Sequence, residues 1–542
     1  MSDFPSSSGG GDDSYLDIPD PIRGFYRSLS RHLSTRNIFQ LHQLYENDFP
    51  KLSERYYPDS SWPHPDEMAR AMEDDEGAVG GGSGKGVQLL YRDLYYRHIY
   101  SKLTVDIDDR IDSFHAYTEL FHTMLQMDQQ VLINHAQQQQ HKSGKGKKGD
   151  RGERAPVPLS SGDAVLFELP VNWLWDLLDE FVYQFESFHL YRARVSKLTE
   201  EELAVLNEQQ DAWNGHTVLR YLHAMVRKAG INVNSSQQAT ATEGVSPFFF
   251  NLGVFALVAL LRVHVLLCDY SGALSALQPL DLRAQKALLS SVPSCFLTLY
   301  YYLGYAYLLL HRYVDSMRVL SYLTQFRQRN KHMQHRIAQS QSMATRMDRV
   351  QAVLVLAAAL HPDQLDDAVQ QEVKDKFGDK LTRLQRFDRS TFEELFFQCA
   401  PKCLTLTPAS SQLYQPPSEL RQQQWAVWWT DVAERSRLPA LVSYLRLFSS
   451  VSISKLASQL SLNEPDTLAL LLMYGSKSEE ERWTAGGVAQ GRRVAVLDTE
   501  MKLDGERVEM SKEYAQRRYG DFFVRQIVRL EEIQRELQTA SK

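Results

Sequence analysis

The fold of this chain is decided by residues 451–510, which read VSISKLASQLSLNEPDTLALLLMYGSKSEEERWTAGGVAQGRRVAVLDTEMKLDGERVEM. Ser452 is a good N-cap for a first helix, in which apolar residues recur at i, i+3, i+4 and i+7 from Ile453 to Leu460. After a break of three residues, Asn463 predicts the start of a second helix. We expect its apolar face to comprise Leu468, Leu471 and Leu472, and its left-handed C-cap to be Gly475.

A β-hairpin follows the two helices. Asp504-Gly505 is a tight-turn signal between the short apolar runs Met501–Leu503 and Val508–Met510. Residues Val494–Leu497 are a candidate third strand. The order helix, tight turn, helix and hairpin predicts a winged helix.

The acidic charge of this module indicates that it does not recognise DNA. Base recognition requires Arg, Lys, Asn or Gln on the second helix, and residues Glu464–Tyr474 contain none of these. Ten acidic residues stand against six basic ones between Glu464 and Met510. Because nucleic-acid binding needs a basic surface, the module is better suited to docking on proteins.

A long helix is predicted after the module, over Ser511–Leu537. At 1.5 Å per residue it would be about 40 Å long, more than a module of this size supports. We therefore expect its apolar stripe to pack against helices of other subunits, as in a helical bundle. The stripe comprises Tyr519, Phe523, Ile527, Leu530, Ile533 and Leu537.

Upstream of the module the chain carries a weak internal repeat of helix pairs. The pattern that begins at Leu266 returns at Leu309, an offset of 43 residues, and small residues such as Gly253 and Gly304 suit close helix packing. Such pairs stack into a solenoid resembling tetratricopeptide repeats. The predicted division is a leader (1–20), an N-terminal helical region (21–247) with insertions at 73–86, 137–158 and 233–247, the helical repeats (248–450), the winged helix (451–510) and the terminal helix (511–542).

Composition indicates a soluble cytoplasmic protein. The 542 residues carry a net charge of -7, which favours neither polyanions nor anionic membranes as an overall partner. Four cysteines are too few for a disulfide scaffold and fit a reducing compartment. Residues Met1–Asp13 do not resemble a secretory signal, and the apolar run Val254–Leu267 is interrupted by charge and predicts a buried helix.

No motif predicts catalysis, a cofactor or a metal. The Gly-rich segment Gly80–Gly86 superficially resembles a phosphate-binding loop, but no strand precedes it and the magnesium-binding hydroxyl is missing, so we interpret it as a linker. Cys399 and Cys403 lack the second pair of ligands that zinc needs. Two further groups are interpreted as a solvated and a charged helix face: His332 with His335, and the acidic turn of Asp176, Asp179 and Glu180.

The basic segment between residues 142 and 154 leaves two interpretations open. It is a candidate RNA-contacting loop, because exposed cations attract phosphates regardless of sequence. The interpretation that the sequence favours is a solvated insertion, which needs no function. Its basic residues are Lys142, Lys145, Lys147, Lys148, Arg151 and Arg154.

The order of helical repeats, winged helix and terminal helix resembles the PCI domain shared by scaffold subunits of the proteasome lid, the signalosome and initiation factors. Several segments are similar to the subunit L family of eukaryotic translation initiation factor 3, and they follow the family's order from roughly residue 20 to residue 540. The chain departs from the family at the Gly-rich linker, at the Gln/Lys/Gly loop and in its leader. The similar segments are YRDLYYRHIY (91–100), WLWD (173–176), DEF (179–181), YYYLGYAY (300–307), KFGDK (376–380), FEELF (392–396) and RRYGDFF (517–523).

This resemblance implies a non-catalytic scaffold subunit without cofactor, small-molecule substrate or membrane. Members join their winged helices side by side and bundle their C-terminal helices, with subunits K and E among their partners. The complex binds the small ribosomal subunit and promotes pre-initiation complex assembly and mRNA recruitment. Two alternatives stay open: a PCI scaffold of a lid or signalosome complex, against which the segments 95–100 and 517–523 argue, and a free-standing winged-helix nucleic-acid regulator, which the acidic second helix disfavours.

Overall fold

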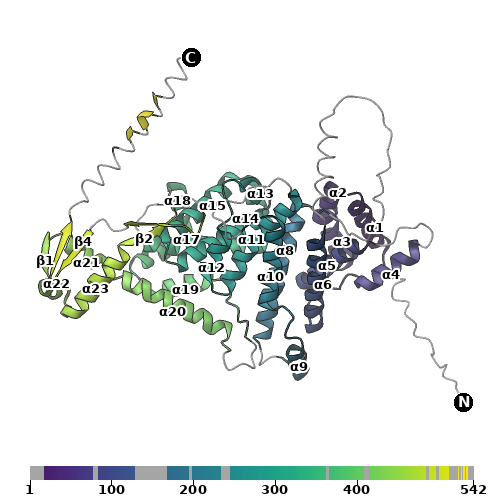
Figure 1. Cartoon of the computed structure of the whole chain (residues 1–542), viewed down its shortest axis with the longest axis horizontal. Helices are drawn as coiled ribbons and strands as arrows, with labels where there is room; N and C mark the ends of the chain where they lie inside the picture. Colours follow the sequence, from purple (N-terminus) through teal and green to yellow (C-terminus); the bar gives the residue numbers. More distant parts are fainter. Residues whose placement is uncertain are drawn as a thin grey trace. The chain divides into compact units, whose positions relative to one another are not determined.

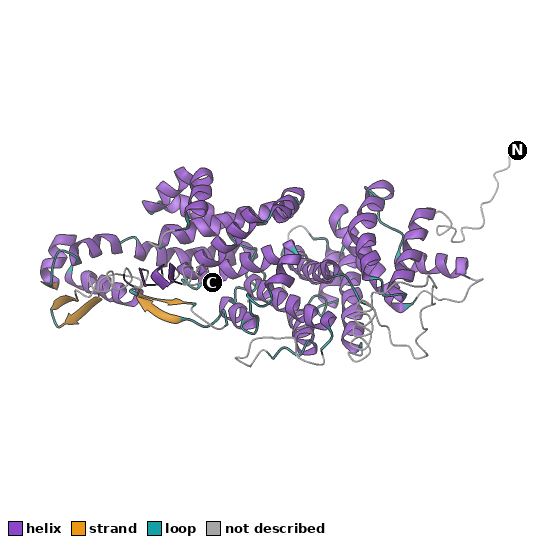
Figure 2. Cartoon of the chain, turned by 90° about the horizontal axis from the view of Figure 1, so that it is seen from above, coloured by secondary structure: helices purple, strands orange, loops and turns teal. Residues whose placement is uncertain are grey.

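The computed structural model describes residues 18–76, 84–127, 168–194, 198–232, 245–361, 365–407, 414–483, 487–495 and 500–511, with residues 523, 526–527, 529–531 and 533–534 near the C-terminus. Helices dominate these residues, and every strand among them lies between Ser450 and Ser511 (Figure 1, Figure 2). The fold is mostly α, a helical solenoid followed by a winged helix, as the sequence predicts.

The chain forms two compact units. Unit 1 comprises residues Met1–Tyr302 and Pro401–Leu420, and unit 2 comprises Leu303–Ala400 and Arg421–Lys542. The finer division into domains given above stays a prediction. Of the predicted insertions, residues 137–158 lie outside the described residues, as do 77–83 within 73–86 and 233–244 within 233–247.

Unit 1 is built from helices that begin at Asp20, and one of them, α14, continues into unit 2. The short element η2 has π-helical hydrogen bonding. The elements are α1 (Asp20–Ser34), α2 (Ile38–Gln43), η2 (Leu44–Asp48), α3 (Phe49–Tyr56), α4 (Pro65–Glu76), α5 (Lys85–Lys102), α6 (Ile107–Gln126), α8 (Val171–Arg192), α9 (Glu200–Glu208), α10 (Gly215–Lys228), α11 (Pro247–Leu266), α12 (Tyr270–Leu277), α13 (Lys286–Ser291) and α14 (Pro293–Leu309).

The centre of unit 1 is α11. Pro247 occupies the first turn, and the Ser246 hydroxyl caps the helix by accepting a hydrogen bond from the amide of Phe248 (3.3 Å). Among the described residues α11 alone is long and apolar enough to cross a membrane, but 89% of its most apolar window is buried within the protein. Helices α8, α10 and α12 pack on it. The prediction of a buried helix at Val254–Leu267 is confirmed.

The predicted repeat is confirmed in the pairs α11–α12 and α14–α15 (Tyr313–Arg329). Both connections place a residue other than glycine in the left-handed region, Cys268 with φ 62° and His311 with φ 60°. The next amide of each turn donates back to a carbonyl of the first helix over the same 2.9 Å, from Asp269 to His264 and from Arg312 to Tyr307. The turn is therefore repeated along with the helices.

Glycine is required where α11 and α14 pack tightly on a neighbour, which is the end of α10 for Gly253 and α15 for Gly304. A Cβ on Gly253 would lie 2.3 Å from the Cβ of Ala229, and one on Gly304 would lie 2.5 Å from Cδ2 of Leu320. Both distances are shorter than carbon atoms tolerate, so the close packing expected of these two glycines is confirmed.

Unit 2 continues the solenoid from the end of α14. Here α15, α18 and α19 pack on α17, which is buried along much of its length. After α15 the helices are α16 (Lys331–Gln339), α17 (Gln341–Leu360), α18 (Asp367–Gln385), α19 (Arg389–Cys399), α20 (Pro417–Arg435) and α21 (Leu438–Leu445).

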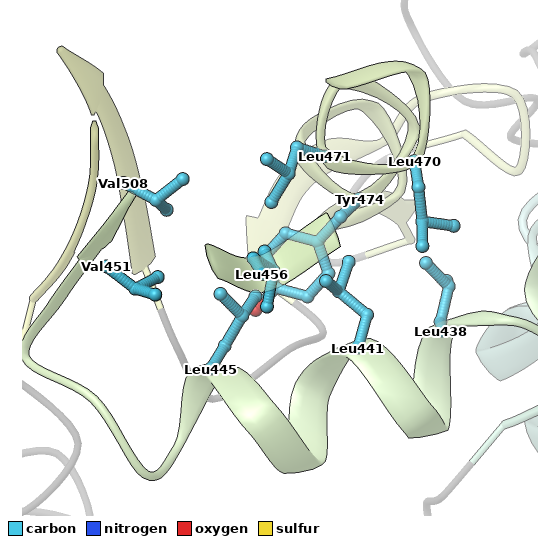
Figure 3. Packing of buried hydrophobic residues seen from close by; sticks show 9 residues of the cluster. All are labelled: Leu438, Leu441, Leu445, Val451, Leu456, Leu470, Leu471, Tyr474 and Val508. Atoms are coloured by element: carbon cyan, nitrogen blue, oxygen red, sulfur yellow. The ribbon is translucent and has the colours of Figure 1, made fainter. Parts of the chain in front are cut away.

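The winged helix follows α21. It consists of β1 (Ser450–Ser452), α22 (Ile453–Leu460), α23 (Glu464–Lys477), β4 (Glu500–Asp504) and β5 (Arg507–Ser511). The strand order is β1-β5-β4, all antiparallel, with Val451 opposite Val508. The core joins the sheet to both helices and to α21, whose Leu441 and Leu445 point toward Leu471 and Tyr474 (Figure 3).

Four details of the prediction are wrong. Helix α23 does not end at Gly475 but continues to Lys477, and its buried face comprises Thr467, Leu470, Leu471 and Tyr474, while Leu472 is 61% exposed. Four leucines within five positions fit more than one helical face, so the pattern alone could not choose between them.

The other two errors concern strands. The hairpin loop is Gly505-Glu506, with φ 58° at Gly505, because Asp504 already pairs with Arg507. The strand expected at Val494–Leu497 is β3 (Arg492–Ala495), and it pairs with β2 (Glu479–Arg482) in a separate two-stranded sheet. The third strand of the winged-helix sheet is β1, just ahead of α22.

Candidate interaction surfaces

The outward face of α23 offers no chemistry for reading bases. Its first turn exposes Glu464 and Asp466, and Leu472 stands farther along. The only Lys or Arg in this helix is Lys477, whose ammonium group pairs with Asp431 and lies 2.7 Å from the carboxylate of Glu434. Since that cation is only 12% exposed and already paired, the face is acidic and apolar.

Asp431 of α20 links the solenoid to the winged helix within unit 2. Its carboxylate accepts hydrogen bonds from the Tyr313 hydroxyl (2.9 Å) and from Nε of Arg435 (3.0 Å), and it binds the ammonium of Lys477. His311 Nδ1 lies 3.3 Å away. Burial alone would raise the pKa of Asp431, but these partners hold it well below its usual range. The carboxylate is therefore ionised and tied to three helices.

A second buried pair holds the loop between β2 and β3. Asp315, at the start of α15, has a fully buried side chain that lies 2.7 Å from Nη2 of Arg312. Both carboxylate oxygens also accept the amide of Trp483, at 3.0 and 2.8 Å. The Arg312 guanidinium in turn donates to the carbonyls of Ala489 (3.3 Å) and Gln490 (3.4 Å). The Arg312–Asp315 pair thus binds the loop at both of its ends, at Trp483 and at Ala489–Gln490.

Further polar contacts hold the β2–β3 hairpin, by which we mean the described residues 479–483 and 487–495. The Tyr307 hydroxyl donates to the carbonyl of Val488 (2.7 Å), and the amide of Val314 donates to Glu480 of β2 (3.3 Å). His361 Nε2 lies 3.4 Å from the same Glu480, and both side chains are buried. The hairpin is consequently part of the solenoid surface, and sequence reasoning missed this. The one available signal was Arg312, which stands in the second repeat where the first has Asp269.

The predicted stripe of the terminal helix is described at four of its six positions. Phe523, Ile527, Leu530 and Ile533 are all helical, with exposed fractions of 60%, 54%, 64% and 44%. Tyr519 and Leu537 lie outside the described residues, as does the basic loop with its six lysines and arginines. Spacings of four, three and three residues put the four described side chains on one helical face. A row of apolar side chains is unfavourable in contact with water, and such exposed rows are typical of protein-binding sites.

The acidic turn of α8 serves the core of unit 1. Asp176 accepts the Tyr45 hydroxyl (2.7 Å) and lies 3.8 Å from Nη1 of Arg97, and Glu180 accepts from Gln184 (2.9 Å). Burial raises the pKa of Asp176 to about 6 and that of Glu180 to about 7, although Arg97 opposes both shifts. These groups face tyrosine and arginine, not an open cleft.

Their neighbours explain why the segment 91–100 is rich in charged and aromatic residues. Asp93 receives the Tyr117 hydroxyl (2.9 Å), the Trp173 indole NH (3.1 Å) and Arg97 (3.2 Å). Nearby, Arg262 of α11 lies 2.6 Å from Asp179. Of the acidic side chains that the sequence placed on a charged helix face, Asp176 and Asp179 therefore join α8 to other helices, whereas Glu180 bonds within α8.

The remaining candidate sites are described in part, because residues 80–83 of the Gly-rich segment lie outside the described residues. Among the described residues, no group of three or more His, Cys, Asp or Glu side chains could hold a metal ion. Lys85, which would end the phosphate-binding loop, begins α5 and lies 3.0 Å from Glu119. Cys399 and Cys403 fall in different units, while His332 and His335 are exposed on α16.

Known proteins resemble the chain along nearly its whole length. Residues 109–530 match a family described as RNA polymerase I-associated factor PAF67. A protein of Nematostella vectensis, called eukaryotic translation initiation factor 3 subunit L, is 32% identical over 99% of this chain and 96% of its own length. Proteins of the same name from Xenopus laevis and Homo sapiens are each 32% identical, over 92% and 91% of this chain and 84% and 82% of theirs.

Proposed function

The chain belongs to the subunit L family of eukaryotic translation initiation factor 3, and from that premise we propose that it is a non-catalytic scaffold subunit of this factor. It acts in translation initiation in the cytoplasm through protein–protein contacts. Its partners are other subunits of the factor, subunits K and E among them, and through the assembled complex it supports small ribosomal subunit binding, pre-initiation complex assembly and mRNA recruitment.

The observation that carries this proposal is the exposed apolar row on the terminal helix. Four large apolar side chains, each 44–64% exposed, share one helical face. Full burial of one such side chain contributes about 1.5–3 kcal/mol. Four of them, each with about half of its surface still to bury, would contribute about 3–6 kcal/mol to a helical bundle with partner subunits, before the costs of association.

The winged helix supports the same proposal from its outer surface. Leu472 on α23 and Leu447 after α21 are 61% and 74% exposed, and the first turn of α23 is acidic. Phosphate groups would be repelled there, whereas a neighbouring protein would cover the leucines. The module thus serves as a docking surface between subunits.

The test is affinity purification of the tagged full-length chain from cells, with mass spectrometry of the proteins that co-purify. The wild-type chain should bring down the other subunits of the factor, including K and E. The double variant Ile527→Asp/Leu530→Asp should lose them, because it places two charges in the row. The control Arg529→Asp/Glu531→Asp changes two exposed positions of the same helix that flank the row, and it should retain them. Equal recovery with the row variant would contradict the proposed bundle.

A further inference from the structure

Two cysteines that are far apart in the sequence meet in unit 1. Cys268 is the left-handed residue between α11 and α12, and Cys403 lies in residues 401–407, which we call the strap. Their thiols are hydrogen-bonded to each other. Beside them the amide of Leu404 donates to the carbonyl of Leu266 over 2.9 Å, so the two backbones are also joined.

The strap is fastened at several further points. Arg192, at the end of α8, donates to the carbonyls of Leu406 (2.7 Å) and Thr405 (3.3 Å). The Leu406 side chain fills the space beside Gly215, where a Cβ would lie 2.8 Å from its Cδ1. The strap belongs to unit 1, although α19 before it and most of α20 after it belong to unit 2. The strap contacts therefore fasten this segment to unit 1 between two stretches of unit 2.

We propose that Cys268 and Cys403 form a reversible disulfide, which links the strap covalently to the end of α11 when the protein is oxidised by a peroxide. The two side chains are already hydrogen-bonded, and Cys268 is partly exposed to solvent, whereas Cys403 is 5% exposed. Cytosolic disulfides of this kind are transient and respond to redox conditions.

The chemistry assigns a separate role to each sulfur. The Cys268 thiolate attacks hydrogen peroxide, the O–O bond breaks, one oxygen stays on Cys268 as a sulfenic acid, and the other leaves as water after protonation. Cys403 then attacks that sulfur, the S–S bond forms, and a second water leaves with the thiol proton. Two electrons pass from the two sulfurs to the peroxide, and a dithiol reductant reverses the reaction.

Thiol acidity agrees with this order. The hydrogen bond from Cys403 lowers the pKa of Cys268, burial opposes the shift, and the Tyr270 side chain adds to it. Burial instead raises the pKa of Cys399 to about 12 and that of Cys295 well above its ordinary value. Since the thiolate is the nucleophile, the other two cysteines should not react with peroxide.

The experiment maps disulfides in the intact full-length protein. Reduced protein is treated with hydrogen peroxide, free thiols are blocked with N-ethylmaleimide, and non-reducing peptide digests are analysed by mass spectrometry. We expect a peptide pair joined through Cys268 and Cys403 that disappears on reduction, with Cys295 and Cys399 blocked only after unfolding. In the oxidised protein, amide exchange in residues 401–407 should slow about tenfold or more.

Two variants assign the roles. Cys403→Ser should stop at the sulfenic acid, trapped on Cys268 by dimedone, whereas Cys399→Ser, four residues away, should form the disulfide as the wild type does. The proposal is overturned if wild-type Cys268 is oxidised while Cys403 remains free to react with maleimide. It is equally overturned if the bridge joins Cys403 to Cys399, or if no cysteine pair forms at peroxide concentrations that oxidise Cys268.

Discussion

Replacing Asp315 with alanine should release the β2–β3 hairpin from the solenoid. The Asp315 side chain is fully buried and lies 3.6 Å from the exposed guanidinium of Arg318, and its two closest partners are the guanidinium of Arg312 and the amide of Trp483. The Asp315→Ala variant leaves both without their acceptor. Arg312, whose side chain is 4% exposed, would be a buried cation without a carboxylate.

The structure sets the size of the effect. Removing one partner of a buried ion pair costs about 3–5 kcal/mol, because the remaining charge has lost its solvent and its counter-charge. The Trp483 amide adds about 1–3 kcal/mol if water does not reach it. Since an opened hairpin lets water reach both groups, we expect the local opening free energy to fall by about 3–5 kcal/mol. Amide exchange in the hairpin should then accelerate by about a hundred- to a thousandfold or more.

Hydrogen exchange measured by mass spectrometry, resolved to residues 479–483 and 487–495, is the direct assay. The matched control is Asp348→Ala, which removes an aspartate that is 54% exposed and pairs with Lys376 at the surface. Exposed pairs contribute about 0–1 kcal/mol, so exchange in the hairpin should not change. If the hairpin amides exchange equally slowly in the Asp315→Ala and Asp348→Ala variants, the Arg312–Asp315 pair does not hold the hairpin.

The remaining predictions concern the core of unit 1 and the surface of α23. Lowering the pH from 7.5 to 5.5 should stabilise the contacts between α5 and α8, because the folded chain protonates Glu180 (pKa about 7) and Asp176 (pKa about 6) where the unfolded chain does not. Allowing for the 33% exposure of Asp176, we expect the local opening free energy measured by hydrogen exchange to rise by about 1–2 kcal/mol. The Glu180→Gln variant should lose most of this increase. Two adjacent leucines of α23 should respond differently to substitution, because Leu471 is buried and Leu472 is exposed. Leu471→Asp should lower the free energy of unfolding by about 3 kcal/mol or more and unfold the winged helix. Leu472→Asp should leave the thermal midpoint of the winged helix unchanged and weaken only subunit binding. Equal thermal midpoints for the two variants would show that Leu471 is not on the buried face of α23.

Periodicity and turn chemistry predict the solenoid well because the relevant interactions are local. The offset between Leu266 and Leu309 predicts both helix pairs, and Gly253 and Gly304 predict where the helices approach. Such features depend on residues a few positions apart on one helix face, which a single sequence displays.

Long-range polar contacts were not predictable in the same way. Asp315 meets Trp483, Asp431 meets Lys477, and Cys268 meets Cys403, each across a sequence separation that no local pattern encodes. The acidic turn at Asp176 looks like a solvated face until Tyr45 and Arg97 are placed beside it. The exposed face of α23 was also ambiguous, because consecutive leucines satisfy two helical faces at once.

Sedimentation of the tagged full-length chain in cell extract tests the central claim most directly. If the chain works by offering its exposed apolar row to partner subunits, it should travel through a sucrose gradient with the other subunits of the initiation factor, far ahead of a 62.3 kDa protein. A chain that sediments alone, at the rate of a monomer, in extract where the other subunits are assembled would contradict the account.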